Sequence, residues 1–294
     1  MNRVEVSFFS VNATCAAWLY RPDDVAGDVP CMVMAHGFSL TRHDGLAHYA
    51  QAIARAGAAV LVYDHRFLGD SDGQPRQRVR LSELLADRRS AIAFARSIDG
   101  IDPNRIMVWG YSMSGGSAVE AAAEDPCIAA AILVCPLLDG RWAVTRGMRR
   151  DPRNSAWIFT QVVRDAVGYA VIPATAEPGQ RGMLTNHCEA EGFRATAGPG
   201  SPWRNEVRAA PTAGYASYRP VTKARKVKCP VLIQAGRRDV TVSRAAIDRF
   251  ARQNPRAEVK WYDVDHFGAF HGDGAHRVSA DQAEWLMNLG GEPA

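Results

Sequence analysis

The chain has 294 residues, of which 47% are hydrophobic and 22% are charged, and its formal net charge is +4. This composition is typical of a folded globular protein and excludes a disordered or collagen-like chain. The small, scattered charge excess argues against nucleic-acid binding, and no apolar run is long enough to cross a membrane. The N-terminal residues alternate like a strand, so we expect no secretory signal and a cytoplasmic protein.

The six cysteines show neither a CxxC spacing nor a histidine at a zinc-like interval. Most of them lie in or beside apolar runs, so we expect buried, reduced thiols rather than disulfides. The sequence gives no reason to expect a metal or a cofactor. The cysteines are Cys15, Cys31, Cys127, Cys135, Cys188 and Cys229.

The expected elements alternate between strands and helices. Alternating residues predict a first hairpin at residues 3–9 and 14–20. Continuous apolar runs predict strands at Cys31–Ala35, Ala59–Tyr63, Arg105–Gly110, Ala129–Cys135, Val231–Ala235 and Val259–Val264. Helical spacing predicts helices at Gly45–Ala58, Leu81–Ile98, Gly115–Ala123, Val242–Gln253 and Asp281–Leu289. In the second of these helices, the Arg and Asp residues are expected on the face opposite the apolar one.

Strands that are buried on both faces appear as continuous apolar runs, and their alternation with helices requires parallel crossovers. The predicted fold class is therefore α/β, with a doubly wound, mostly parallel sheet. From about residue 137 to residue 227 this alternation stops, and the segment is rich in aromatic residues and arginine. Such a stretch is too long for a structureless loop. We predict a core of residues 1–136 and 228–294, interrupted by a helical cap at 137–227.

The run Trp109-Gly110-Tyr111-Ser112-Met113-Ser114-Gly115 joins an expected strand directly to a helix of small residues. A turn this sharp strains its central residue and exposes that side chain above the sheet. Ser112 is therefore the candidate nucleophile, although a helix-capping serine is the alternative. Ser114 stands where a glycine is expected, and it is a second candidate for the nucleophile.

An acid and a base follow two late strands of the predicted sheet. Asp239 comes after the strand Val231–Ala235, and His266 comes after the next one. Loops at the carboxyl ends of parallel strands meet at one edge, so these side chains are expected beside Ser112. The order Ser, Asp, His matches a catalytic triad. His271 is an alternative base, and Asp139 is an alternative acid.

Acyl transfer also needs hydrogen-bond donors where negative charge develops on the carbonyl oxygen. The strand that ends in His36-Gly37 offers the backbone N–H of Phe38, and the residue after the nucleophile, Met113, offers a second one. We predict that these two groups form the oxyanion hole. His36 is interpreted as a structural residue that shapes the turn.

The elbow around Ser112, the His-Gly turn, Asp239 and His266 resemble the α/β-hydrolase superfamily along nearly the whole chain. Further runs are similar to the branch of dienelactone hydrolases and X-prolyl dipeptidyl-peptidase-like hydrolases. These runs are Ala35–Phe38, Thr41-Arg42, Gly45-Leu46, Tyr63–Gly73 and Pro75–Gln77. The resemblance implies a serine esterase, thioesterase, peptidase or acyltransferase. Two residues depart from the pattern: Ser114 replaces the elbow glycine, and Phe67 stands where many relatives have glycine.

The predicted function is a serine hydrolase (a carboxylesterase) that cleaves an ester of a small or medium acyl group through an acyl-enzyme. One alternative is a thioesterase or acyltransferase that acts on polyketide-type acyl groups. Another is a catalytically silent, ligand-binding α/β-hydrolase fold. The expected partner is a small acyl substrate, and a homodimer is compatible with the sequence.

Three residues are candidate substrate contacts. Trp142 and Trp157 could line an acyl pocket or merely pack the cap. Arg42 follows the oxyanion turn closely enough to reach a substrate, with a structural salt bridge as the alternative. The arginines Arg146, Arg149 and Arg150 could meet an anionic group or form a solvated face.

Overall fold

The protein is described from a computed structural model, which covers residues 2–23 and 27–290. The strands are β1 (Asn2–Ser10), β2 (Ala13–Arg21), β3 (Val29–Ala35), β4 (Ala59–Tyr63), β5 (Ile101–Tyr111), β6 (Ala130–Val134), β7 (Val171–Ile172), β8 (Val207–Arg208), β9 (Val231–Gly236) and β10 (Ala257–Tyr262). The α-helices are α1 (Leu46–Arg55), α2 (Leu81–Arg96), α3 (Met113–Glu124), α4 (Gly140–Arg150), α5 (Pro152–Val167), α6 (Glu189–Ala197), α7 (Arg244–Gln253) and α8 (Gly272–Gly290). Three 3₁₀ helices are η1 (Ala210–Ser217), η2 (Pro220–Lys226) and η3 (Gly268–Phe270).

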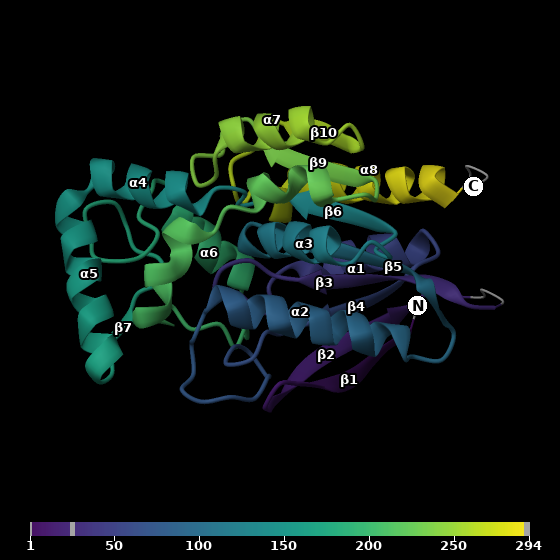
Figure 1. Cartoon of the computed structure of the whole chain (residues 1–294), viewed down its shortest axis with the longest axis horizontal. Helices are drawn as coiled ribbons and strands as arrows, with labels where there is room; N and C mark the ends of the chain where they lie inside the picture. The colour runs from purple at the N-terminus through teal and green to yellow at the C-terminus, as the bar shows by residue number, and fades with distance from the viewer. Residues whose placement is uncertain (1, 24–26, 291–294) are drawn as a thin grey trace.

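The main sheet has eight strands in the order β1-β2-β4-β3-β5-β6-β9-β10. The β1–β2 and β2–β4 pairs are antiparallel, and all the other neighbours are parallel. The predicted hairpin and the mostly parallel sheet are therefore confirmed. Helices cover both faces of the sheet (Figure 1). No helix among the described residues has both the length and the apolar character to span a bilayer.

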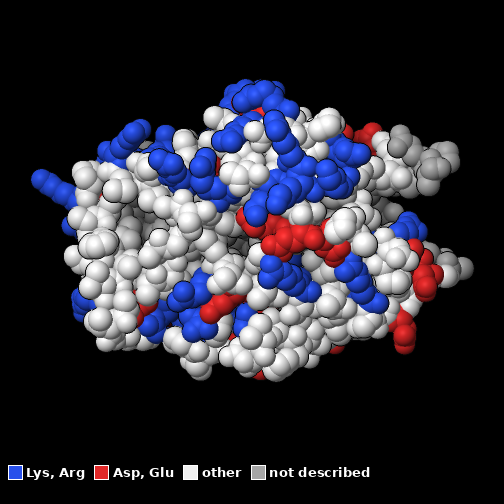
Figure 2. Space-filling view, in the orientation of Figure 1, with Lys and Arg blue, Asp and Glu red and all other residues white. Residues whose placement is uncertain are grey.

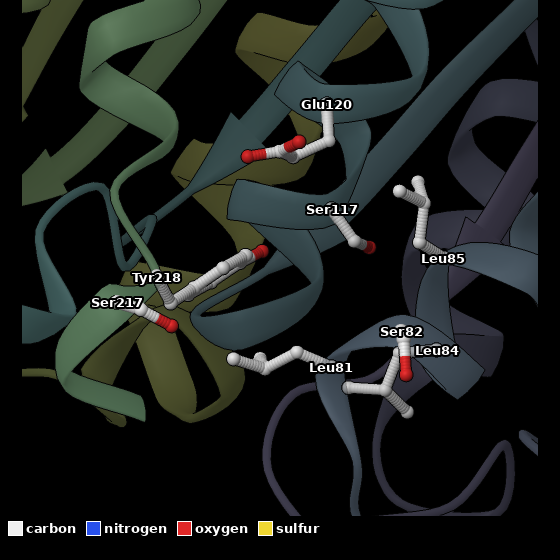
Figure 3. Close-up of a pocket in the computed structure, with 8 residues that line it drawn as sticks. All are labelled: Leu81, Ser82, Leu84, Leu85, Ser117, Glu120, Ser217 and Tyr218. Atoms are coloured by element: carbon white, nitrogen blue, oxygen red, sulfur yellow. The ribbon is translucent and has the colours of Figure 1, made fainter. Parts of the chain in front are cut away.

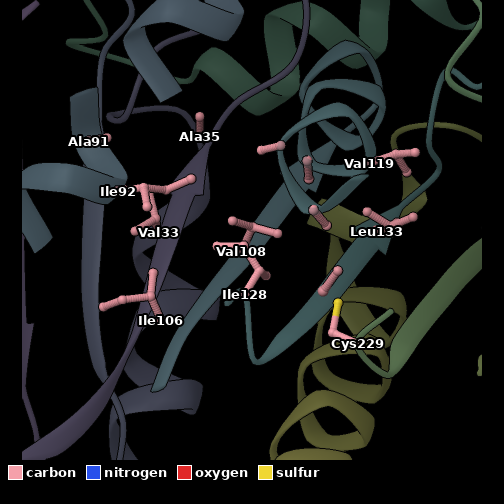
Figure 4. Close-up of a cluster of buried hydrophobic side chains, with 14 of the residues drawn as sticks. Val33, Ala35, Ala91, Ile92, Ile106, Val108, Val119, Ile128, Leu133 and Cys229 are labelled. Carbon is pink, nitrogen blue, oxygen red and sulfur yellow. The ribbon is translucent and has the colours of Figure 1, made fainter. Parts of the chain in front are cut away.

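Side chains of the central strands alternate between two buried clusters. Val33 and Val108 pack with α2 and α3 on one face (Figure 4), whereas Met34 and Trp109 pack with α1 on the other. Both faces of the sheet are thus buried, which explains why the sequences of these strands are continuous apolar runs.

Two expected elements differ from the observed ones. The last helix, α8, begins at Gly272 rather than at residue 281; its first turns were missed because Ala275 and Val278 are their only buried apolar residues. In α2, Asp87 and Arg88 are both 0% exposed, so their predicted place on a solvent face is wrong. Each has buried partners from other elements: Asp87 accepts from Ser10 Oγ at 2.7 Å, and Arg88 Nε donates to Ser117 Oγ at 2.9 Å.

Residues 137–227 form α4, α5, α6, the two 3₁₀ helices η1 and η2, and the two-stranded β7–β8 ribbon. Much of this segment gathers beside one end of the main sheet (Figure 1). A third buried cluster joins it to residues that follow core strands, among them Phe38, Met113 and Phe267. By contrast, Val221 and Ala224 of η2 belong to the main core cluster. The packing thus continues into the core before residue 228, where the sequence placed the boundary.

Candidate active site

Ser112 lies at the turn between β5 and α3 with a φ of 52°. This left-handed conformation is strained for a serine, as expected for a nucleophile elbow. The turn is fixed by the Ser112 N–H, which donates to the Val134 carbonyl at 2.9 Å, and by the Ser112 carbonyl, which accepts from the Leu137 N–H at 2.8 Å. A Cβ at Gly110 would lie 2.1 Å from the Ser114 carbonyl oxygen, so the turn requires glycine there.

The three predicted triad residues lie together. His266 Nε2 is 3.1 Å from Ser112 Oγ, and His266 Nδ1 is 2.6 Å from Asp239 Oδ2. The exposed fractions of Ser112 and His266 are only 8% and 4%. The second carboxylate oxygen of Asp239 accepts from the backbone N–H groups of Thr241 (2.8 Å) and Val242 (3.2 Å). These bonds hold the carboxylate so that one oxygen faces the imidazole.

Tyr111 supports the histidine from the strand side, a role that the sequence did not suggest. Its hydroxyl donates to the His266 carbonyl at 3.0 Å, and the two rings lie with their centroids 4.9 Å apart. Burial raises the pKa of Tyr111 well above its usual value, which keeps the hydroxyl protonated and able to donate. The only sequence signal was the residue's position next to Ser112.

The alternative residues lie elsewhere. The Ser114 hydroxyl donates to the His36 carbonyl, and its side chain is 1% exposed. His271 is exposed and its Nε2 lies 3.2 Å from Thr196 Oγ1. Asp139 accepts from the Trp142 N–H at the start of α4 and pairs with Arg219 at 3.2 Å. These contacts give each of the three side chains a structural role, so none of them needs a role in catalysis to explain its position.

The two predicted oxyanion donors flank the elbow and belong to one apolar cluster. Neither the Phe38 N–H nor the Met113 N–H donates to another group in the described loops and helix cap. Gly37 lies against the elbow, because a Cβ there would be 3.1 Å from the Ser112 Cβ. His36 shapes this turn: Nδ1 accepts from the Gly37 N–H at 2.8 Å, and Nε2 donates to the Asp44 carbonyl at 2.6 Å.

The structure does not support Arg42 as a substrate contact. Its guanidinium is 2.8 Å from Asp64 and 2.9 Å from Asp70, and its side chain is 2% exposed and covers the Trp18 ring. The salt-bridge alternative fits this geometry.

The two candidate tryptophans have different surroundings. Trp142 is half-buried, with the Arg146 guanidinium 5.3 Å from its ring centroid. Trp157 packs against the cluster that contains Phe38 and Met113, so it is the better placed of the two for an acyl pocket.

Two groups of side chains have donor atoms close enough to hold a metal ion. One is Cys135 with Asp239 and His266, and the other is His43 with Asp64 and Asp70. Burial raises the pKa of the Cys135 thiol well above its usual value, and Asp239 and His266 are already hydrogen-bonded within the triad. Asp64 and Asp70 are already ion-paired with an arginine.

A separate cavity of about 190 Å³ lies between α2, α3 and η1 (Figure 3). Glu120 and Ser117 of α3 line one side, and burial raises the pKa of Glu120. Two lining residues bond to the elbow: the Tyr218 hydroxyl donates to the Met113 carbonyl at 3.0 Å, and the Ser117 hydroxyl donates to the Ser114 carbonyl at 3.1 Å. None of the predicted site residues lines this cavity.

The chain matches the family described as serine aminopeptidase, S33, over residues 29–271. The match covers most of the chain, so the protein belongs to this hydrolase family, and its fold is that of the α/β-hydrolases. The finer resemblance to the dienelactone hydrolase branch stays a prediction.

Three similar proteins cover almost the whole chain. The quorum-quenching protein AidA of Acinetobacter baumannii is 33% identical over 97% of this chain and 95% of its own length. The polyketide transferase af380 of Aspergillus fumigatus is 27% identical over 97% of this chain and 98% of its own length. The crystal structure of the α/β hydrolase GrgF from Penicillium sp. sh18 superimposes with a TM-score of 0.83 at 21% identity, over 98% and 99% of the two chains.

Proposed function

We propose that this protein is a serine hydrolase that cleaves a carboxylic ester of a small or medium acyl group through an acyl-enzyme. The observation that carries the proposal is the unbroken chain of contacts from Asp239 to His266 to Ser112, with distances of 2.6 and 3.1 Å. A hydrogen-bonded nucleophile, base and orienting acid are what acyl transfer by serine requires.

In the proposed first step, Ser112 Oγ attacks the substrate carbonyl carbon while His266 Nε2 takes the hydroxyl proton. Asp239 holds the Nδ1–H and stabilises the imidazolium that forms. The N–H groups of Phe38 and Met113 donate to the developing oxyanion. His266 then returns the proton to the leaving oxygen, and the Ser112 ester is left as the acyl-enzyme.

In the second step, water gives a proton to His266 and attacks the acyl carbon, and the proton returns to Ser112 as the acid leaves. We propose that residues 137–227 act as a cap whose apolar inner side, with Trp157, contacts the acyl chain. The burial of Ser112 supports this part of the proposal, because a nearly closed site favours an apolar acyl group over water.

The test is hydrolysis of a panel of esters, thioesters and amides that share one acyl chain. Ser112→Ala and His266→Gln should lower kcat by about 10⁴-fold or more, and Asp239→Asn should lower kcat by a similar factor. The matched control is His271→Gln, which removes the nearby exposed histidine and should keep wild-type turnover. Full activity in His266→Gln, or its loss in His271→Gln, would overturn the assignment of the base.

Acyl transfer to an alcohol or amine is a second candidate, supported by the full-length similarity to a protein named polyketide transferase. The two functions share the acyl-enzyme and differ in what attacks it. Adding an acceptor alcohol to the ester assay separates them. A transferase gives mainly the new ester, whereas a hydrolase gives mainly the free acid.

A further inference from the structure

Helix α5 presents an apolar stripe to solvent. Its exposed apolar residues follow one another at intervals of three or four residues, with Val167 four residues after Val163, and this spacing places them on one side of the helix. Phe159 is 68% exposed, Val163 49% and Val167 86%, whereas most large apolar side chains of this protein are buried. The stripe consists of Pro152, Ala156, Phe159, Val163, Ala166 and Val167.

The opposite side of α5 is firmly anchored. Trp157, Ile158 and Val162 pack against the third buried cluster. At one end Asn154 Nδ2 donates to the Gly182 carbonyl at 2.8 Å, and at the other end the buried Asp165 accepts from Arg208 Nε at 2.7 Å. The inner face therefore already fixes this helix, and the outer stripe is not required for that packing.

Charge is concentrated in the same part of the chain. Residues 137–227 contain 14 Lys and Arg against 7 Asp and Glu, a net charge of +7, although the whole chain has only +4. The rest of the protein is thus slightly acidic. Figure 2 shows white surface bordered by blue at the end of the molecule where α5 lies.

The cations beside the stripe have few acidic neighbours. Arg153 and Arg164 lie on α5 itself and are exposed, as are Arg149 and Arg150 of α4. The two acids of the α4–α5 pair are used within the fold. Asp151 accepts from the Asn154 N–H at the start of α5, and Asp165 is paired with Arg208.

We propose that the outer face of α5 docks onto an anionic lipid surface, with the apolar stripe in the headgroup region and the arginines against lipid phosphates. A helix with an apolar stripe flanked by cations has the pattern of an interfacial helix. A second copy of the chain is the less suitable occupant, because pairing two such faces would bring uncompensated arginines together.

The test is co-sedimentation of the full chain with vesicles of phosphatidylcholine alone and of phosphatidylcholine mixed with phosphatidylglycerol. Wild type should bind the mixed vesicles, not the neutral ones, and bind less as salt is raised. Phe159→Ser with Val163→Ser should lower the bound fraction about tenfold, and Arg153→Gln with Arg164→Gln should do the same.

Phe9→Ser is the matched control, because Phe9 on β1 is also 68% exposed but lies outside this face. It should bind like wild type. No binding of wild type to the mixed vesicles, or equal binding by the Phe159 and Phe9 variants, would overturn the proposal. A wild-type dimer that the Phe159 and Val163 changes convert to a monomer would assign the stripe to a second copy instead.

The docking does not depend on the proposed chemistry. Ser112→Ala should sediment with the mixed vesicles like wild type. Hydrolysis of a short, water-soluble ester should be unchanged by the α5 substitutions. Failure of the proposed function and failure of the docking surface therefore give different results.

Discussion

The buried His36 should make the protein less stable in mild acid. Its side chain is 2% exposed, and burial lowers the pKa of its imidazole to about 3. In the unfolded chain the same group has a pKa of about 6.5. Between these two values the unfolded chain carries a proton that the folded protein does not. The free energy of unfolding therefore falls as the pH falls through this window.

The size of this effect follows from the two pKa values. From about pH 7.5 to about pH 4.5, His36 alone should remove about 3 kcal/mol from the free energy of unfolding. The assay is urea unfolding at both pH values for wild type and His36→Gln. The variant lacks the titrating group, so its acid-dependent loss should be smaller by about the same 3 kcal/mol. Titrating groups far from His36 cancel in the difference.

The exposed His187 provides the control for this experiment. His187→Gln should lose as much stability in acid as wild type does. If wild type and His36→Gln lose the same free energy over this pH range, then His36 is not buried in the neutral form, and the geometry assigned to the oxyanion turn is wrong.

Three further predictions concern the elbow and the loops beside it. Gly110→Ala places a Cβ 2.1 Å from the Ser114 carbonyl and should lower the melting temperature sharply, and wild-type melting would contradict the elbow geometry. Ser114→Ala should cost about 1–3 kcal/mol in urea unfolding and keep activity, because it removes the donor to the His36 carbonyl. If Ser114→Ala instead lost activity at unchanged stability, Ser114 would have a catalytic role rather than a structural one. Asp64→Asn removes one of the two carboxylates close to the buried Arg42 guanidinium, leaves Asp70 in place, and should cost about 1.5–3 kcal/mol. The free energy of unfolding should be compared at a pH above the Asp64 pKa of about 6, where the carboxylate is charged. Equal stability of Asp64→Asn and wild type would contradict the structural ion pair.

The fold was largely predictable from the sequence because its central strands are buried on both faces. Their continuous apolar runs differ clearly from the helical spacing of segments such as Leu46–Arg55. The proximity of Ser112, Asp239 and His266 was predictable for a related reason. All three follow the carboxyl ends of parallel strands, which meet at one edge of the sheet.

Long-range polar contacts were not predictable, because nothing local identifies the partner. Arg88 looks like a surface residue of an amphipathic helix, yet its guanidinium donates to the Trp109 carbonyl at 3.1 Å and the Ser114 carbonyl at 3.2 Å. Arg42 was ambiguous for the same reason, since its partner Asp64 lies on a different loop. The η2 helix was missed because its buried residues Val221 and Ala224 make only one three-residue repeat, which is too short to distinguish from a loop.

Labelling with a fluorophosphonate, followed by mass spectrometry of the peptides, tests directly whether Ser112 is an activated nucleophile. A fluorophosphonate reacts far faster with a serine that a neighbouring base activates than with an ordinary serine. One adduct is expected on Ser112; it should be absent in Ser112→Ala and form much more slowly in His266→Gln. An unlabelled wild-type protein would contradict the serine-hydrolase proposal. An adduct on Ser114 would show that Ser114, not Ser112, is the nucleophile.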